Sequence, residues 1–248
     1  MNSRDLVYLI RAKLKYAWLR RKPYAPCDFA YQHHIYLPEW QLVYFFVPKV
    51  ACTSIKSVLM ELLRSPSAVS PHAFDFPKLD RRTFIDDVTR MDSFAVVRDP
   101  LSRLISGYKS MVLRAAHDRQ YLHGVYRPLL KYGGFRHAMD FEDFCLRVVE
   151  IPDRWADPHF RSQTTCFTHA EANCLPHRIM RFDSIATEIP AYLQQVTGQR
   201  IDLPKQNQTD DVSFDSTLSN ECRQLLRSRF DSDFRLYEEL AMPLRKSA

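Results

Sequence analysis

The pattern of apolar residues in the first quarter of the chain changes from strand-like to helical within a few positions. Residues 43–47 form a short apolar, aromatic and β-branched run, which predicts a buried strand. Pro48 ends that run and holds the residue before it extended. After it, apolar residues recur at the spacing of one face of a helix, namely at Ile55, Val58, Leu59, Leu62 and Leu63. With Thr53 or Ser54 as the cap, the stretch predicts a strand, a tight loop and the N-terminus of a helix.

A second stretch repeats this order further along the chain. Residues 94–97 are the predicted strand, Asp99 is a good N-cap and Pro100 is a good first helical residue. The buried face of the helix consists of Leu101, Leu104, Ile105, Tyr108, Met111 and Val112. This helix therefore begins directly at the carboxyl end of its strand.

The rest of the chain adds a third strand and further helices. Residues 178–182 form the strand, and the helix after it has Pro190 near its start and stops at Gly198. Other helices are expected at 81–89, at 140–149 and, as one or two helices, at 218–240. The stretches 23–38 and 115–134 predict loops, short extended pieces or a broken helix. Strands alternating with helices predict an α/β fold with a parallel sheet flanked by helices.

The N-terminus differs from the rest of the chain in its charge. An apolar run at residues 6–10 is followed by six basic residues, namely Arg11, Lys13, Lys15, Arg20, Arg21 and Lys22. The run of five residues is too short to span a bilayer or to form the core of a signal peptide. We therefore expect a basic amphipathic helix within residues 1–30, which could lie on anionic lipid or pack against the domain. Residues 31–248 are expected to form a single domain.

Composition and charge narrow the class of protein. With 248 residues, 46% of them hydrophobic, the chain can bury a large core. Its formal net charge of +6 suits a polyanionic ligand, nucleic acid or an acidic membrane surface. Six cysteines occur without a Cys-x-x-Cys pair, which favours buried thiols in a reducing compartment over a disulfide framework. No cluster of ligands predicts a metal site.

The two strand–helix junctions carry the candidate chemistry. A strand, tight loop and helix N-terminus direct backbone N–H groups and the positive end of a helix dipole at one point, which suits a phosphate. Lys49 adds a cation there, and Thr53 and Ser54 add hydroxyls. At the second junction, Arg98 stands beside the polar stripe of the helix and could bind one phosphate together with Ser106.

Residues 48–53 (Pro-Lys-Val-Ala-Cys-Thr) resemble the 5′-phosphosulfate loop of sulfotransferases that use 3′-phosphoadenosine 5′-phosphosulfate (PAPS), above all the carbohydrate branch that includes the chondroitin 4-O-sulfotransferases. The Arg-Asp-Pro at 98–100, with Ser106 eight residues after the arginine, is similar to the 3′-phosphate site of these enzymes. Residues 157–163 resemble a downstream His-x-x-x-Gln segment of the same branch. The sequence departs from the family at Ala51, where many members have Gly, and at Ile55, where this branch commonly has the Trp that could stack on adenine.

The resemblance implies a P-loop-like sulfotransferase fold, PAPS as co-substrate, no metal and a hydroxyl acceptor, expected to be a carbohydrate. The residues that it implies for donor binding are Lys49, Val50, Ala51, Cys52, Thr53, Ser54, Arg98 and Ser106. Lys49 would neutralise charge on the leaving phosphate. The base would be His72, in the loop where heparan sulfate 2-O-sulfotransferases place a similar histidine, or His159 as second choice.

Two other functions compete with this interpretation. A nucleic-acid- or membrane-binding protein without catalysis would use the +6 charge and the basic helix, but its basic residues should cluster on one face with interleaved aromatics. A nucleotide kinase would need a Walker lysine, and residues 48–53 lack that pattern. Related eukaryotic enzymes usually carry a Golgi anchor, so this sequence favours a cytoplasmic, bacterial sulfotransferase that does not bind nucleic acid.

Overall fold

The computed structural model describes residues 3–21, 29–64, 69–113, 120–122, 124–168, 175–204 and 217–242. The chain divides into two compact units. The first, here called the sheet unit, comprises Asp28–Pro100, Ser162–Asp210 and Ser232–Ala248. The second, the helical unit, comprises Met1–Cys27, Leu101–Arg161 and Asp211–Asp231. The N-terminal segment predicted at 1–30 thus falls almost wholly in the helical unit.

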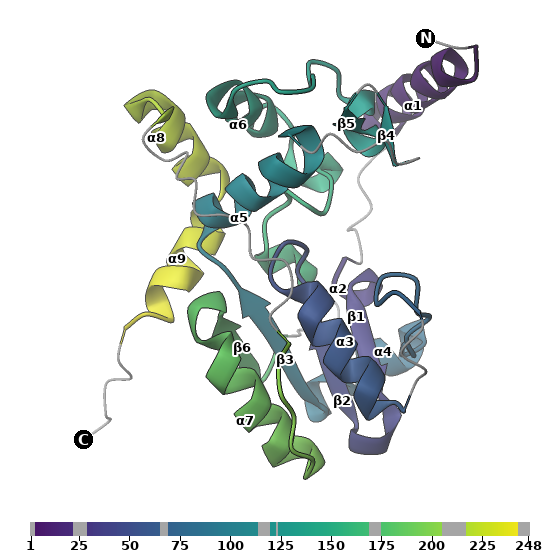
Figure 1. Ribbon diagram of the computed structural model, residues 1–248, viewed down its shortest axis with the longest axis vertical. Helices are drawn as coiled ribbons and strands as arrows, with labels where there is room; N and C mark the ends of the chain where they lie inside the picture. Colours follow the sequence, from purple (N-terminus) through teal and green to yellow (C-terminus); the bar gives the residue numbers. More distant parts are fainter. Residues whose placement is uncertain are drawn as a thin grey trace. The chain divides into compact units, whose positions relative to one another are not determined.

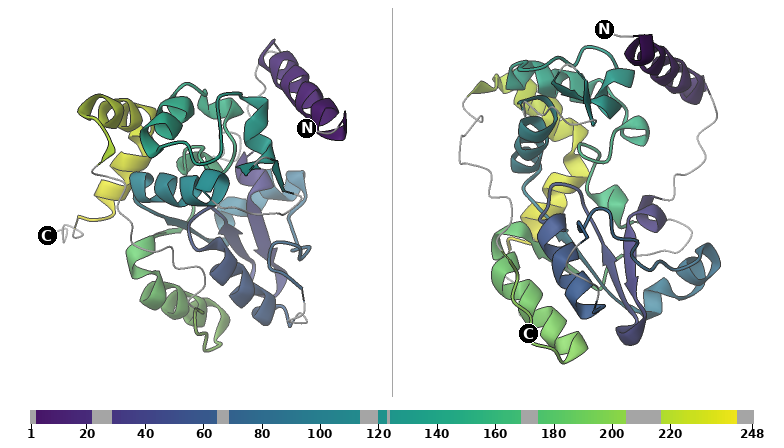
Figure 2. Two further views of the ribbon diagram at one scale, coloured as in Figure 1. Left: turned by 45° about the horizontal axis from the view of Figure 1, so that its top comes forward. Right: turned by 45° about the vertical axis from the view of Figure 1, so that its right-hand side comes forward.

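The sheet unit contains a four-stranded sheet of order β1-β2-β3-β6. Its strands are β1 (His34–Leu37), β2 (Leu42–Phe45), β3 (Asp92–Val97) and β6 (Arg178–Arg181). The last three are parallel, and Figure 2 shows helix α3 running along them. The predicted α/β class with a parallel sheet and flanking helices is confirmed. The sheet also has an antiparallel edge strand, β1, within the stretch predicted as loop and short extended pieces.

Helices cover both faces of this sheet (Figure 1). The helices of the sheet unit are α2 (Phe29–Gln32), α3 (Cys52–Leu62), α4 (Arg81–Asp87), α7 (Ile185–Thr197) and α9 (Asp231–Glu239). Successive strand residues point to opposite faces, so Tyr44 and Phe45 mark the two sides. Phe45 meets Phe84 of α4, whereas Tyr44 stacks on Phe94, whose other neighbour is Tyr192 of α7. These contacts place α4 and α7 on opposite faces.

The helical unit is built from α1 (Ser3–Arg21), α5 (Pro100–Tyr108), α6 (Phe141–Val149) and α8 (Asn220–Arg229). A π-helical turn, Lys109–Leu113, continues α5, and β4 (Tyr121–Leu122) pairs with β5 (Val125–Tyr126) in a small hairpin. Short 3₁₀ turns of the two units lie at Pro38–Trp40, Val88–Arg90, Arg127–Lys131, Asp153–Trp155, Thr164–Cys166 and Phe182–Ser184. Within the described part of the chain, no helix is both long and apolar enough to cross a bilayer.

Several predicted boundaries hold. Pro100 is the first residue of α5, and Gly198 ends α7 in a left-handed conformation with φ of 71°. Asp140 caps α6 by accepting a hydrogen bond from the N–H of Asp143 at 2.8 Å. Cys145, Cys166 and Cys222 are buried thiols, as expected, and Cys52 is half-buried.

Two boundaries differ from the prediction. Neither Thr53 nor Ser54 caps α3, because the helix already begins at Cys52 and Ala51 occupies the cap position without a side-chain hydrogen bond. Pro190 lies inside α7 and not near its start, because the helix begins at Ile185 directly after a 3₁₀ turn. Proline costs one helical hydrogen bond there, and the buried Ile189 and Leu193 keep that part of α7 on the sheet.

Candidate active site

The loop between β2 and α3 is anchored at both ends. Val47 and Val50 are buried in the core of the sheet unit, whereas Lys49 between them is half-exposed. Lys49 and Ala51 both adopt left-handed backbone conformations, with φ of 70° and 48°. Residues other than glycine rarely adopt this conformation, which costs about 1–2 kcal/mol. Such strain persists only where the surroundings impose it, and it concentrates at functional sites.

The same turn leaves the first N–H groups of α3 ahead of the helical hydrogen-bond ladder. The N–H of Ile55 donates to the Ala51 carbonyl at 3.1 Å, so Cys52, Thr53 and Ser54 precede that bond. The first four N–H groups of an α-helix have no acceptor within the helix. With the helix dipole, they form a site suited to an anion. The loop joins a strand to the N-terminus of a helix, as the sequence predicted, and its binding of a phosphate stays a prediction.

His72 lies at this loop. Its Nε2 is 2.9 Å from the Thr53 hydroxyl oxygen, which lies in the first turn of α3. His72 is exposed on the protein surface. Of the two histidines proposed as the base, His72 is thus the one that the sheet unit holds beside the predicted 5′-phosphate loop.

Lys56 is a half-buried cation that no motif in the sequence marks. Its ammonium lies 4.1 Å from the centre of the Phe46 ring and 5.9 Å from that of Phe76. Burial lowers the pKa of Lys56; the charge of Lys78 lowers it further, whereas Cys52 opposes the shift. Within the described residues no carboxylate pairs with it. The sequence feature that could have pointed to Lys56 is its position three residues after Thr53, on the same face of α3.

Arg98, proposed for the 3′-phosphate, follows β3 directly, and its backbone is held on both sides by one amide. The Gln163 side chain accepts from the Arg98 N–H at 2.9 Å and donates to the Arg98 carbonyl at 2.8 Å. The guanidinium lies 4.5 Å from the centre of the Phe182 ring. Ser106, its proposed partner, is buried in α5 of the helical unit. Joint binding of one phosphate by Arg98 and Ser106 stays a prediction.

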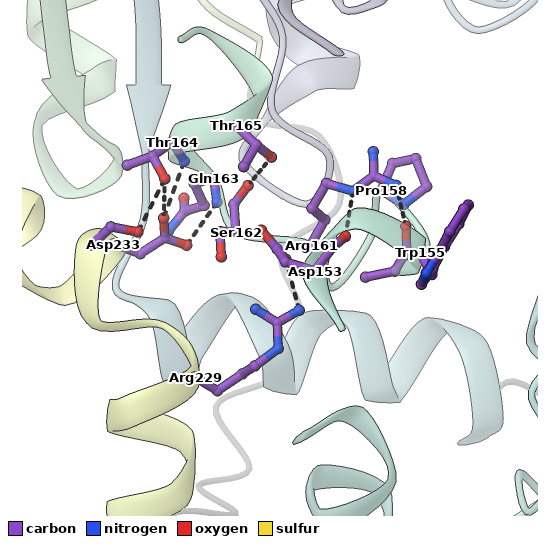
Figure 3. Close-up of polar contacts among 12 residues, drawn as sticks. Asp153, Trp155, Pro158, Arg161, Ser162, Gln163, Thr164, Thr165, Arg229 and Asp233 are labelled. Carbon is purple, nitrogen blue, oxygen red and sulfur yellow. Dashed lines mark hydrogen bonds and ion pairs between the residues drawn. The ribbon is translucent and has the colours of Figure 1, made fainter. Parts of the chain in front are cut away.

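Gln163 is itself fixed by a buried carboxylate from the C-terminal helix. Asp233 accepts hydrogen bonds from the Gln163 N–H at 2.7 Å, the Thr164 N–H at 3.0 Å and the Thr164 hydroxyl at 3.1 Å (Figure 3). A buried carboxylate is stabilised by several such donors. α9 therefore helps to hold the carboxyl end of β3. Gln163 belongs to the His-x-x-x-Gln segment within residues 157–163, whereas no pattern in the sequence marks Asp233.

His159 lies in the helical unit and is oriented by a buried carboxylate. Asp157 contacts the His159 Nδ1 at 2.6 Å and accepts from its backbone N–H at 3.1 Å. Burial acts to raise the pKa of Asp157, but the hydrogen bonds and charge of His159 and the charge of Lys131 together hold it below its usual value. The contact at Nδ1 fixes the orientation of the His159 ring.

Two buried arginines hold the loop that carries His159. Arg103 donates to the carbonyls of Pro158 at 2.8 Å and Arg161 at 2.7 Å. Arg161 donates in turn to the carbonyls of Ala156 and, at 3.1 Å, Asp153. The Arg103 side chain is buried and braces this loop.

The start of the same loop is held by side chains from elsewhere in the helical unit. The Asp153 carboxylate pairs with Arg229 of α8 at 2.7 Å (Figure 3). The Tyr132 hydroxyl donates to the Trp155 carbonyl at 2.6 Å. These bonds hold the backbone of the loop that carries His159.

Comparison with known protein families identifies the family to which the chain belongs. The sulfotransferase family profile matches residues 32–238, which is most of the chain. The protein belongs to the sulfotransferase family. No curated protein and no solved structure matches it.

Membership makes this sulfotransferase a transferase that moves a sulfuryl group to a hydroxyl-bearing acceptor, with a donor that in this family is generally PAPS. Membership of this family favours a sulfotransferase over a binding protein without catalysis and over a nucleotide kinase. The matched region includes the loop at 48–54, both histidines, Arg98 and Ser106. Among the described residues, no group of three or more His, Cys, Asp or Glu side chains is arranged to hold a metal ion.

Proposed function

We propose that the protein transfers the sulfuryl group of PAPS to a hydroxyl of a carbohydrate. The observation that carries the proposal is the left-handed turn at Lys49 and Ala51, which directs the N–H groups at the start of α3 toward one point. Donor binding is assigned to Lys49, Val50, Ala51, Cys52, Thr53, Ser54, Arg98 and Ser106. The loop would hold the 5′-phosphate, and Arg98 with Ser106 the 3′-phosphate.

In the proposed reaction the acceptor oxygen forms a bond to sulfur as the bond from sulfur to the 5′-phosphate oxygen breaks. Lys49 neutralises the charge that collects on this phosphate, and adenosine 3′,5′-bisphosphate leaves. The acceptor's proton passes to a histidine. The chain supplies positioning and charge neutralisation, as proteins do in phosphoryl transfer.

The base is His72 or His159, and the geometry gives each a separate argument. His72 lies at the donor loop through its contact with Thr53. His159 has a carboxylate behind it, as general bases commonly do. A single-turnover measurement separates them. Substituting the base by Ala should lower transfer roughly 10²–10⁴-fold with bisphosphate affinity unchanged, whereas a histidine that only holds the donor should weaken bisphosphate binding.

Bisphosphate binding tests the donor assignment. Adenosine 3′,5′-bisphosphate should raise the melting temperature more than AMP or ATP does, because Arg98 and Ser106 are proposed to recognise the 3′-phosphate. Arg98→Ala should remove most of this preference, since a charged hydrogen bond is worth about ten- to a hundred-fold in affinity. Arg90→Ala, an exposed arginine paired with Asp87, is the matched control. Equal stabilisation by bisphosphate and AMP would refute the assignment.

The carbohydrate acceptor is supported by the resemblance of the donor loop to the carbohydrate branch. Transfer of radiolabelled sulfate to a panel of sugars and non-sugar alcohols tests it. Labelling of phenols or steroids with no sugar labelled would exclude this acceptor class and leave the sulfotransferase assignment intact.

A further inference from the structure

Helix α1 has two apolar faces, and one of them is already occupied. Its half-buried residues are Tyr8, Leu9, Ala12 and Tyr16. Tyr16 meets Tyr132 edge to face at 4.9 Å, and the Arg127 guanidinium lies over the Tyr8 ring at 5.2 Å. This face therefore packs α1 onto the 3₁₀ turn Arg127–Lys131 of the same unit.

The other apolar face is exposed. It consists of Leu6, Val7, Ile10, Leu14 and Trp18, whose exposed fractions lie between 45% and 64%. At 3.6 residues per turn these side chains occupy an arc of about 120° on one side of the helix. Other large exposed apolar side chains, such as Val69, Leu146 and Leu175, are scattered. Scattered ones are ordinary, whereas a contiguous row marks an interaction surface.

Basic residues border this apolar row on both sides. On the helical wheel Lys13 lies at one border and Arg11 and Lys15 at the other, and all three are exposed. The whole helix contains six basic residues and one acidic residue. An apolar row between two basic borders is the arrangement of helices that lie in the headgroup region of a membrane. A second copy of α1 would bring the same positive charges together, which opposes self-association through this face.

We propose that α1 binds the surface of an anionic membrane, with its exposed apolar row inserted below the headgroups and Arg11, Lys13 and Lys15 contacting lipid phosphates and carboxylates. The face that carries Tyr8 and Tyr16 remains on the helical unit. The helix thus lies in the membrane plane and does not cross it. This function is independent of sulfuryl transfer.

Vesicle co-sedimentation of the full chain tests the proposal. The protein should bind vesicles of phosphatidylcholine mixed with phosphatidylserine, should bind phosphatidylcholine alone much more weakly, and should dissociate as salt is added. Leu14→Glu should weaken binding more than about tenfold, and Lys13→Gln about fivefold. Leu175→Glu is the matched control, because Leu175 is as exposed as Leu14 but lies in the sheet unit. Unchanged circular dichroism would show that the variants fold.

Tryptophan fluorescence gives a second readout. Addition of anionic vesicles should shift the emission to shorter wavelength, and Trp18→Phe should remove that shift. Equal vesicle binding by the wild type and Leu14→Glu would overturn the proposal. So would a dimer that Leu14→Glu dissociates in a protein that binds no vesicles, because the face would then contact a second copy.

Discussion

Lys49 is the single residue on which the proposed chemistry depends most. Charge builds on the leaving phosphate only as sulfuryl departs, so the ammonium should stabilise the transition state more than the bound donor. Lys49→Ala should therefore lower single-turnover transfer on the order of 10²–10³-fold and leave calorimetric binding of the bisphosphate largely intact. Lys49→Arg should restore part of the rate, because the guanidinium is bulkier and differently shaped. Full activity in Lys49→Ala would make the loop a structural turn.

Ala51 carries a strain that a stability measurement can detect. Glycine at a left-handed position relieves about 1–2 kcal/mol, which offsets the roughly 0.5–1 kcal/mol that glycine costs through the unfolded chain. Ala51→Gly should therefore leave the free energy of unfolding in urea unchanged or slightly raised. The control is Ala191→Gly at an exposed helical position of α7, which should cost about 1 kcal/mol. Equal losses in both variants would show that Ala51 is not left-handed in solution.

At the scale of elements, one buried histidine connects α2, β1 and the segment before α4. His34 Nδ1 contacts the Tyr31 carbonyl, and Nε2 accepts from the Leu79 N–H at 2.8 Å. Burial lowers the pKa of His34 to about 4; the bond to Tyr31 opposes this shift and the charge of Lys78 adds to it. The neutral ring is the form that the fold needs, because only it can accept the bond from Leu79.

A pH dependence of stability follows from His34. Its pKa is lower in the folded than in the unfolded protein, so its contribution is complete above pH 6.5 and is lost as the pH falls toward 4. The loss is on the order of 3 kcal/mol for a shift of this size. Urea unfolding between pH 7 and pH 4 should show this decline, and His34→Gln, less stable at pH 7, should show a smaller one. Parallel curves for both proteins would contradict the assignment.

The sequence predicted those elements whose determinants are local. Strands β2 and β3, the start of α5 at Pro100 and the end of α7 at Gly198 follow from apolar periods and from proline and glycine at their usual positions. The start of α3 could not be predicted in this way, because Ala51 adopts a left-handed backbone conformation that its own side chain disfavours. A core contact at Val50, and not local preference, holds that turn.

The parts of the candidate site that could not be predicted depend on contacts between distant residues. Gln163 bonds to Arg98, 65 positions earlier, and Asp233 to Gln163, 70 positions later. No periodicity or motif spacing encodes such pairs. The two faces of α1 could not be predicted either. Packed tyrosines on one face and exposed apolar residues on another weaken the amphipathic pattern of the helix. Its basic character was readable, whereas its division into a packed and an exposed face required the structure.

At the scale of the whole molecule, the proposed donor residues are distributed over both units. The loop and Arg98 belong to the sheet unit and Ser106 to the helical unit, while α6 and α8 carry none of them. Hydrogen exchange with and without adenosine 3′,5′-bisphosphate can therefore map the donor site residue by residue. A ligand at a hundred times its dissociation constant adds about 2.7 kcal/mol to any opening that releases it. Exchange through such openings slows about a hundredfold.

We expect this slowing at residues 52–55 and in α5 around Ser106, with α6 and α8 as internal references whose exchange does not change. Arg98→Ala at the same ligand concentration should reduce the effect at both places, because it lowers occupancy. Protection of the loop without protection of α5 would remove Ser106 from the 3′-phosphate site and leave the 5′-phosphate assignment standing. Protection spread equally over α6 and α8 would mean that the ligand stabilises the whole chain against global unfolding, and the residue assignments would then rest on the substitutions alone.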